Sequence, residues 1–235
     1  MSAGQNIVVL TGAGMSAESG VPTFRGVDGL WEGHRIEEVA SPEGFARDPE
    51  LVHHFYNLRR AALNTVEPNA GHLALVKLER EWRGKFLLVT QNVDDLHERA
   101  GSEKLIHMHG ELRKARCECC GAVLSWTQEL SSGTRCRACG EIGGLRPHIV
   151  WFGEFPFEME TIMSALEGAD VFLCIGTSGV VYPAAGFAQQ VASHSNCRLI
   201  EINIERTEIS RHFHEHIVGP VSAELPKLVE RLLSA

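Results

Sequence analysis

Four short apolar runs, each followed directly by small or polar residues, constrain the fold of this chain most strongly. They lie near residues 7–10, 86–90, 171–175 and 198–202, with helix-like segments between them. Alternating strands and helices predict an α/β fold with a parallel sheet. The carboxyl ends of parallel strands meet at one edge, which is where such sheets bind their ligands. We therefore expect the polar residues after these runs to form one site for a nucleotide-sized ligand.

The first run breaks into the glycine-rich segment Thr11-Gly12-Ala13-Gly14-Met15-Ser16-Ala17. A strand, a glycine-rich turn and a helix start present backbone N–H groups to a phosphate. Ala17 stands at the third glycine position of the dinucleotide fingerprint, which allows alanine. Alone, the motif fits a plain tight turn equally well.

The next loop is either a flap over a ligand or a packed surface loop, and it carries Phe24, Arg25 and Trp31.

The second run delivers polar side chains that could hold a carboxamide or a ribose: Gln91, Asn92 and Asp94, with Val93 between them. A further short strand, residues 105–108, leads to His109-Gly110. An imidazole with a pKa of about 6.5 can accept a proton at neutral pH, so His109 is a candidate base. From the His-Gly pair alone, a solvated or core histidine is the more common outcome.

Seven cysteines in one chain indicate metal binding or inert burial, because we expect a reducing compartment. Cys117-x2-Cys120 and Cys136-x2-Cys139 are separated by fifteen residues. This spacing predicts a zinc ribbon in which four thiolates form a structural, tetrahedral site. Cys119 lies too close to Cys117 for the usual turn, and we interpret it as a bystander.

Bulk properties exclude several classes of partner. Hydrophobic residues make up 44% of the chain, charged residues 22%, and the formal net charge is −8. An acidic chain argues against a nucleic acid bound through a broad basic face, and we expect no sequence-specific nucleic-acid partner. No apolar run approaches the roughly 20 residues of a membrane span, and the first residues lack signal-peptide features. We expect a cytoplasmic protein with no membrane partner.

Residues 35–65 have a helical pattern in which Tyr56 and Arg59 lie three residues apart. A tyrosine hydroxyl beside a guanidinium could receive a carboxylate. Spacing alone also fits an exposed arginine beside an amphipathic tyrosine.

Farther along, the apolar stretch 145–154 could pair with an extended peptide.

Together these segments resemble the sirtuins, a family of NAD-dependent protein-lysine deacylases. The motifs that carry the resemblance follow the family's order over nearly the whole chain: Gly12–Ser16, Pro22–Arg25, Thr90–Asp94, His109–Gly110, the paired Cys-x2-Cys, Gly176–Ser178 and Asn203. Tyr56-x2-Arg59 is similar to the subgroup often called class III, which accepts succinyl and malonyl groups. The resemblance implies a desuccinylase-like deacylase that releases nicotinamide and O-acyl-ADP-ribose.

The resemblance also implies roles for individual residues. His109 would be the catalytic base, and Tyr56 and Arg59 would receive an acidic acyl group. Acyl-lysine proteins would bind as extended peptides, with their lysine in a tunnel lined by Val150, Trp151, Phe152 and Gly153. One structural zinc would be held by Cys117, Cys120, Cys136 and Cys139. The co-substrate NAD would contact Gly12, Ala13, Gly14, Ser16, Ala17, Phe24, Arg25, Trp31, Gln91, Asn92, Val93, Asp94, Gly176, Thr177, Ser178, Asn203, Ile204, Glu205 and Val221.

The implied architecture is a Rossmann-like NAD-binding domain (residues 1–34, 69–112 and 145–235) and a small domain. The small domain would combine a helical insertion, residues 35–68, with the zinc-ribbon module, residues 113–144.

Three other functions are compatible with parts of the sequence. Mono-ADP-ribosyl transfer would use the same co-substrate, a dehydrogenase would produce NADH, and a zinc-ribbon binding module would carry out no reaction.

Overall fold

The computed structural model of the chain describes residues 4–23, 30–31, 33–194 and 196–234, and only the backbone of Leu30, Trp31 and His194. A six-stranded sheet of order β11-β10-β9-β1-β4-β5 dominates the described residues, and all its pairings are parallel. Its strands are β1 (Ile7–Thr11), β4 (Phe86–Thr90), β5 (Leu105–His107), β9 (Val171–Ile175), β10 (Arg198–Asn203) and β11 (Glu215–Val218). The sheet confirms the predicted α/β, Rossmann-like class.

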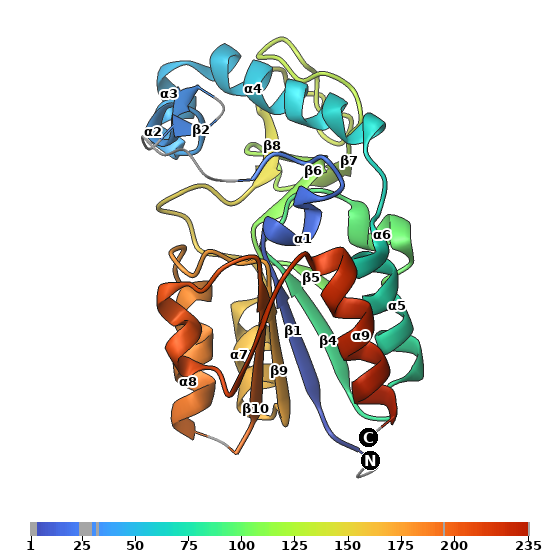
Figure 1. Cartoon of the computed structure of the whole chain (residues 1–235). Helices are drawn as coiled ribbons and strands as arrows, with labels where there is room; N and C mark the ends of the chain where they lie inside the picture. The colour runs from blue at the N-terminus through green and yellow to red at the C-terminus, as the bar shows by residue number, and fades with distance from the viewer. Residues whose placement is uncertain (1–3, 24–29, 32, 195, 235) are drawn as a thin grey trace.

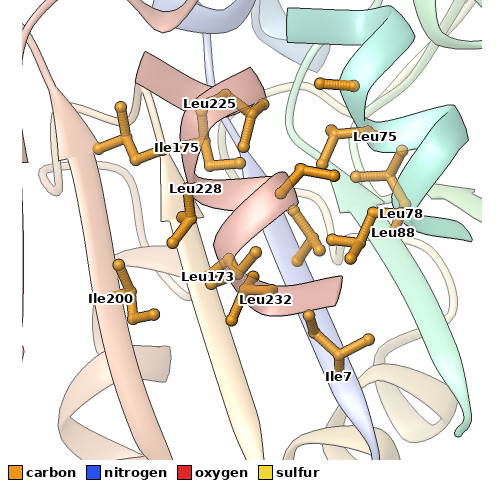
Figure 2. Packing of buried hydrophobic residues seen from close by; sticks show 14 of the residues in the cluster. Ile7, Leu75, Leu78, Leu88, Leu173, Ile175, Ile200, Leu225, Leu228 and Leu232 are labelled. Atoms are coloured by element: carbon orange, nitrogen blue, oxygen red, sulfur yellow. The ribbon is translucent and has the colours of Figure 1, made fainter. Parts of the chain in front are cut away.

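The central strand β1 is buried along its whole length because helices cover both faces of the sheet. Ile7 and Val9 point to the face covered by α5 (Ala70–Glu81) and α9 (Val221–Ser234), which Figure 2 shows from close by. Val8 and Leu10 point to the face covered by α7 (Met159–Glu167) and α8 (Phe187–His194). Side chains alternate along a strand, so an unbroken apolar run is what a sheet covered on both faces requires.

Two elements of this region differ from the sequence pattern. β11 is not among the expected strands, because Glu215-His216-Ile217-Val218 is short and half polar, as an edge strand can be. α9 starts at Val221, earlier than the expected Leu225, and continues through Pro226. Pro226 lies inside α9 and has no backbone N–H, so α9 lacks the hydrogen bond to the Ser222 carbonyl.

A second region lies beyond the carboxyl ends of the parallel strands, at the top of Figure 1. It contains a three-stranded antiparallel sheet of order β7-β6-β8 and a two-stranded hairpin. The antiparallel sheet consists of β6 (Gly110–Cys117), β7 (Val123–Ser125) and β8 (Leu145–Ile149), and the hairpin of β2 (Leu30–Trp31) and β3 (His34–Arg35). The helices of this region are α2 (Ile36–Val39), α3 (Pro42–Arg47), α4 (Pro49–Ala62) and the 3-10 turn η1 (Leu63–Thr65).

β8 pairs with β6, so the first residues after the cysteine module belong to the antiparallel sheet and not to the parallel one. β8 is an edge strand of this sheet. The division of the chain at residues 112 and 145 stays a prediction.

Short helical elements complete the described fold: α1 (Gly14–Ala17), α6 (Leu96–Ala100), η2 (Ala184–Gly186) and η3 (Glu208–His212). Among the described residues, every helix falls short of the length and apolar character that a bilayer crossing requires.

Candidate functional site

A pocket of about 320 Å³ lies at the carboxyl ends of β1, β4, β9 and β10, and residues of α4 line its opposite side. It joins two walls. The sheet contributes the turns after these four strands, and the second region contributes residues of α4 and the segment after β8. Sequence-predicted residues on its walls are Gly12, Ala13, Gly14, Ser16, Ala17, Tyr56, Arg59, Gln91, Asn92, Val93, Asp94, His109, Val150, Trp151, Phe152, Gly153, Gly176, Thr177, Ser178, Asn203, Ile204 and Val221.

The floor of the pocket is made by two glycine-containing turns in direct contact. Gly12 N–H donates to the Ile175 carbonyl at 2.9 Å, and Gly14 N–H donates to the Gly176 carbonyl at 2.8 Å. A Cβ on Gly14 would lie 2.7 Å from the Cα of Gly176, and Gly176 has a φ of +61°. Glycine at positions 14 and 176 therefore lets the two turns pack against each other, and we call the floor that they form the cradle.

Polar side chains between the strand ends are bonded to one another. Asn92 Nδ2 donates to Ser16 Oγ at 3.0 Å, and Gln91 Nε2 donates to Thr177 Oγ1 at 3.0 Å. Asn203 Nδ2 donates to the Thr177 carbonyl at 2.8 Å. These bonds tie the turns after β1, β4, β9 and β10 into one polar surface, as the sheet rule predicts.

Asp94 belongs to the same surface and is 3% exposed. Burial raises the pKa of this carboxyl, against a hydrogen bond from Ser16 that lowers it. Its Oδ1 accepts the Leu96 N–H at 3.1 Å, which fixes the turn that enters α6. Asp94 is thus held rigidly at the pocket wall.

His109 follows β5 and faces the pocket from the loop that leads into β6. Its Nδ1 lies 3.2 Å from the Gln91 carbonyl. A carbonyl oxygen only accepts hydrogen bonds, so Nδ1 carries the proton and Nε2 keeps its lone pair. Burial lowers the pKa of His109, and the Gln91 bond only partly offsets this effect. The imidazole is therefore neutral at pH 7 and can accept a proton at Nε2.

The lowered pKa of His109 predicts how activity depends on pH on the acid side. Activity that needs neutral His109 should fall as the pH decreases through a value below 6.5, the ordinary pKa of histidine. The measurement is kcat/KM against pH in buffers of constant ionic strength. An acid limb centred above pH 6.5 would contradict the assignment.

Tyr56 and Arg59 form the far wall of the pocket from α4, where Asp48 caps the helix by accepting the Leu51 N–H. Tyr56 is fully buried and Arg59 is 9% exposed, so the alternative of an exposed arginine is wrong. The Trp151 indole Nε1–H donates to Tyr56 Oη at 3.0 Å. A phenol and a guanidinium thus lie together in a buried chamber, and both can bond a carboxylate.

Trp151 is itself held by a charged network that the sequence did not indicate. Glu154 Oε2 accepts the Trp151 N–H at 2.8 Å, and Glu154 Oε1 pairs with Arg146 and Arg116, each at 2.7 Å. The Arg146 guanidinium carbon lies 3.2 Å from the centroid of the Trp151 ring. Arg146 is 3% exposed, and its stacking fixes the plane of the indole against Tyr56.

Some predicted residues are not placed in the pocket. Glu205 is exposed and is not part of the described walls. Phe24 and Arg25 lie outside the described residues, and of Trp31 only the backbone is described. Conversely, sequence reasoning missed wall residues that carry no polar or aromatic pattern of their own, such as Ala40, Leu112 and Pro156.

The four paired cysteines converge although they lie on two separate turns. The Sγ atoms of Cys117, Cys120, Cys136 and Cys139 all lie within 4.8 Å of one another. Cys117 Sγ lies 3.8 Å from Cys139 Sγ, and Cys120 Sγ lies 4.0 Å from Cys136 Sγ. Zinc–sulfur bonds of about 2.3 Å in a tetrahedron separate the sulfurs by about 3.8 Å, so the set fits structural Zn²⁺. Cys119 is not part of this set, in agreement with its interpretation as a bystander.

These features define a class: an α/β protein with a Rossmann-like sheet, an inserted four-thiolate module, and a pocket between the sheet, α4 and the segment after β8. The model of the Sir2 family matches residues 12–183. The chain belongs to the Sir2 family.

Curated relatives span nearly the same length. An "NAD-dependent protein deacylase" of Vibrio vulnificus is 56% identical over 98% of this chain and 94% of its own. A protein of the same name from Escherichia coli strain K12 is 54% identical over 97% of this chain and 82% of its own.

Solved structures agree with the fold. A Sir2 homologue in complex with NAD has a TM-score of 0.87 and 42% identity, covering 97% of this chain and 89% of that one. A Sir2 protein bound to acetylated peptide has a TM-score of 0.82 and 27% identity, and the match covers 96% of this chain and 92% of that one.

Proposed function

We propose that this protein is an NAD-dependent protein-lysine deacylase whose chamber also accepts acidic acyl groups. The observation that carries the proposal is the position of His109. His109 lines a pocket that joins the backbone cradle on one side to Tyr56 and Arg59 on the other, and its Nδ1–H tautomer leaves the Nε2 lone pair available to accept a proton. Relatives named as NAD-dependent protein deacylases and Sir2 structures with NAD and with acetylated peptide support it.

The cradle would fit a dinucleotide because glycines 12 and 14 let the turns after β1 and β9 pack closely and leave no side chain of their own at the pocket floor. We assign the pyrophosphate to the Gly12–Ser16 segment, the nicotinamide carboxamide to Asn92 and Asp94, and the adjoining ribose to Gln91. The adenosine side would lie against Gly176, Thr177, Ser178 and Asn203, with Ile204 and Val221 beside the adenine. The roles of Phe24, Arg25, Trp31 and Glu205 stay predictions.

Bound NAD supplies an electrophilic ribose carbon and the hydroxyls that take over the acyl group. This chain's residues bind, orient and move a proton. His109 Nε2 would accept the proton of a ribose hydroxyl, while its Nδ1–H bond to the Gln91 carbonyl holds the ring in the productive tautomer. Burial around Asp94 and Asn92 excludes water from the nicotinamide end, so hydrolysis of NAD without acyl-lysine is suppressed.

Protein substrates would enter as extended peptides beside the segment Val150–Gly153, with the acyl-lysine passing Trp151 and Phe152. We expect an acetyl group to end before Tyr56 and Arg59, and the carboxylate of a succinyl group to reach these two buried residues. A buried guanidinium and phenol favour a carboxylate because a charge-assisted bond gains strength in a site of low dielectric.

The test is steady-state kinetics on acetyl-lysine and succinyl-lysine peptides of one sequence, following nicotinamide release. Arg59→Met should lower kcat/KM for succinyl-lysine ten- to a hundredfold relative to acetyl-lysine, because one charge-assisted bond is worth about 1.5–3 kcal/mol. Tyr56→Phe should act in the same direction by a smaller factor.

The matched control is Arg211→Met, the same change at an exposed arginine of η3. Equal losses on both peptides in Arg59→Met would remove the carboxylate-receptor role. Label from NAD that ends on protein would indicate mono-ADP-ribosyl transfer, and NADH absorbance would indicate a dehydrogenase.

A further inference from the structure

His107, the last residue of β5, lies between two hydrogen-bond acceptors. Its Nδ1 is 3.1 Å from the Asn92 carbonyl, and its Nε2 is 2.7 Å from Oε1 of Glu98 on α6. A carbonyl accepts and an ionised carboxylate accepts, so a ring that serves both must carry a proton on each nitrogen. The geometry therefore selects the imidazolium form of His107.

The surroundings of His107 balance this charge. Glu98, His107 and Glu111 offer ligand atoms within 4.8 Å of one another, and Lys114 Nζ pairs with Glu111 at 2.6 Å. Two cations thus face two carboxylates. Asp94 adds attraction from the loop after β4, and His97 on α6 is neutral because burial holds its pKa well below 6.5.

The His107 side chain is 8% exposed and that of Glu98 is 40% exposed. Burial lowers the pKa of His107, but the hydrogen bond and charge of Glu98, with help from Glu111 and the Asn92 carbonyl, raise it above 6.5 overall. Among the described residues, no carboxylate pairs with neighbouring His109, and burial lowers its pKa. The pKa values of two histidines two residues apart are therefore shifted in opposite directions.

The two rings hold consecutive carbonyls of one loop. His109 bonds the carbonyl of Gln91, and His107 bonds the carbonyl of Asn92. The Asn92 side chain meanwhile donates to Ser16 on the pocket wall. A shift of the Asn92 backbone would therefore move a side chain that the proposed function assigns to nicotinamide.

We propose that His107 is a positioning residue: its imidazolium links the Asn92 carbonyl to Glu98 and so holds the loop after β4 in the shape that binds nicotinamide. We call this arrangement the His107 clamp. The role assigned to nicotinamide rests on the proposed function, whereas the clamp itself is a property of the fold.

The clamp implies an alkaline limit to NAD binding. A histidine whose pKa is raised in the folded protein contributes fully below its ordinary value of 6.5, and the contribution is lost as the pH rises through the raised pKa. Neutral His107 can donate to one partner only, so the Asn92 carbonyl or Glu98 loses its bond. The KM for NAD should therefore rise on the alkaline side.

The first experiment tests the clamp without catalysis. Long-range proton–nitrogen NMR spectra of the zinc-loaded protein should show both His107 nitrogens protonated at pH 6.5, with a titration midpoint above pH 6.5. In Glu98→Gln the His107 midpoint should move to lower pH. A His107 midpoint at or below pH 6.5, or one that does not move in Glu98→Gln, overturns the proposal.

The second experiment measures function with His107→Gln, whose amide donates to one acceptor at every pH. We expect the KM for NAD to rise about three- to tenfold, with a smaller change in kcat, and the alkaline rise of KM to disappear. His54→Gln is the matched control and should keep the wild-type profile. Circular dichroism and the melting temperature establish that each variant is folded. Glu98→Gln is a second test variant, in which the alkaline rise of the KM for NAD should begin at lower pH.

Unchanged KM and an unchanged alkaline limb in His107→Gln would exclude a positioning role. Wild-type protein that releases no nicotinamide would instead refute the proposed function, and the NMR titration would still decide the clamp.

Discussion

Replacing His109 with alanine is expected to lower kcat at least about a hundredfold while NAD affinity changes less than about threefold. General bases typically contribute factors of 10² to 10⁴, and here the base is a neutral imidazole whose Nδ1–H is bonded to the Gln91 carbonyl. NAD affinity should persist because the cradle at Gly12 and Gly14 and the amides after β4 are untouched.

The measurements are single-turnover nicotinamide release and NAD binding by calorimetry. His54→Ala, at an exposed position of α4, is the matched control and should keep wild-type kcat. Activity of His109→Ala above a few per cent of wild type would exclude His109 as the base. Loss of NAD binding together with turnover would indicate a folding role instead.

Loss of a zinc ligand should destabilise the protein strongly. The cysteine module has a small apolar core in which two of the thiolates are themselves members: Ala115, Cys117, Trp126, Leu130, Cys136 and Leu145. So small a core supplies little folding energy, and a structural zinc site provides what is missing. We expect Cys136→Ser to cost at least about 3 kcal/mol, which lowers the melting temperature by about 6–12 °C for a chain of this size.

The effect should extend to the pocket, because Leu145 begins β8, which leads to Trp151. Hydrogen exchange should therefore increase at residues 113–151, and deacylation should fall. Cys119→Ser is the matched control: it makes the same chemical change at a thiol outside the set and should retain one zinc per chain. Equal melting temperatures for the two variants would refute a structural metal site.

The parallel sheet could be predicted because local pattern determines it. The residues of β1 alternate between two apolar faces, and any chain with such runs between helices must bury them in a covered sheet. β8 was harder to assign. Its sequence reads as an apolar stretch, and only its pairing with β6 decides that it joins the cysteine module.

Some parts of the candidate site could likewise be predicted from the sequence, and others could not. Gln91, Asn92 and Asp94 could be placed at one edge because strand ends of a parallel sheet converge there. Tyr56 and Arg59 could be placed on one helix face, but helical spacing does not reveal whether that face is exposed. Packing of α4 against Trp151 makes it a buried wall.

The sequence by itself determined the α/β class, the sulfur ligands and the order of the motifs, because each depends on residues close together in the chain. Tertiary structure alone decided which side chains meet across long separations and what charge they carry. His107 and His109 look alike in the sequence, yet Glu98 favours a proton on one and burial disfavours it on the other. Charge depends on solvation and on neighbours in space, and only the folded chain brings those together.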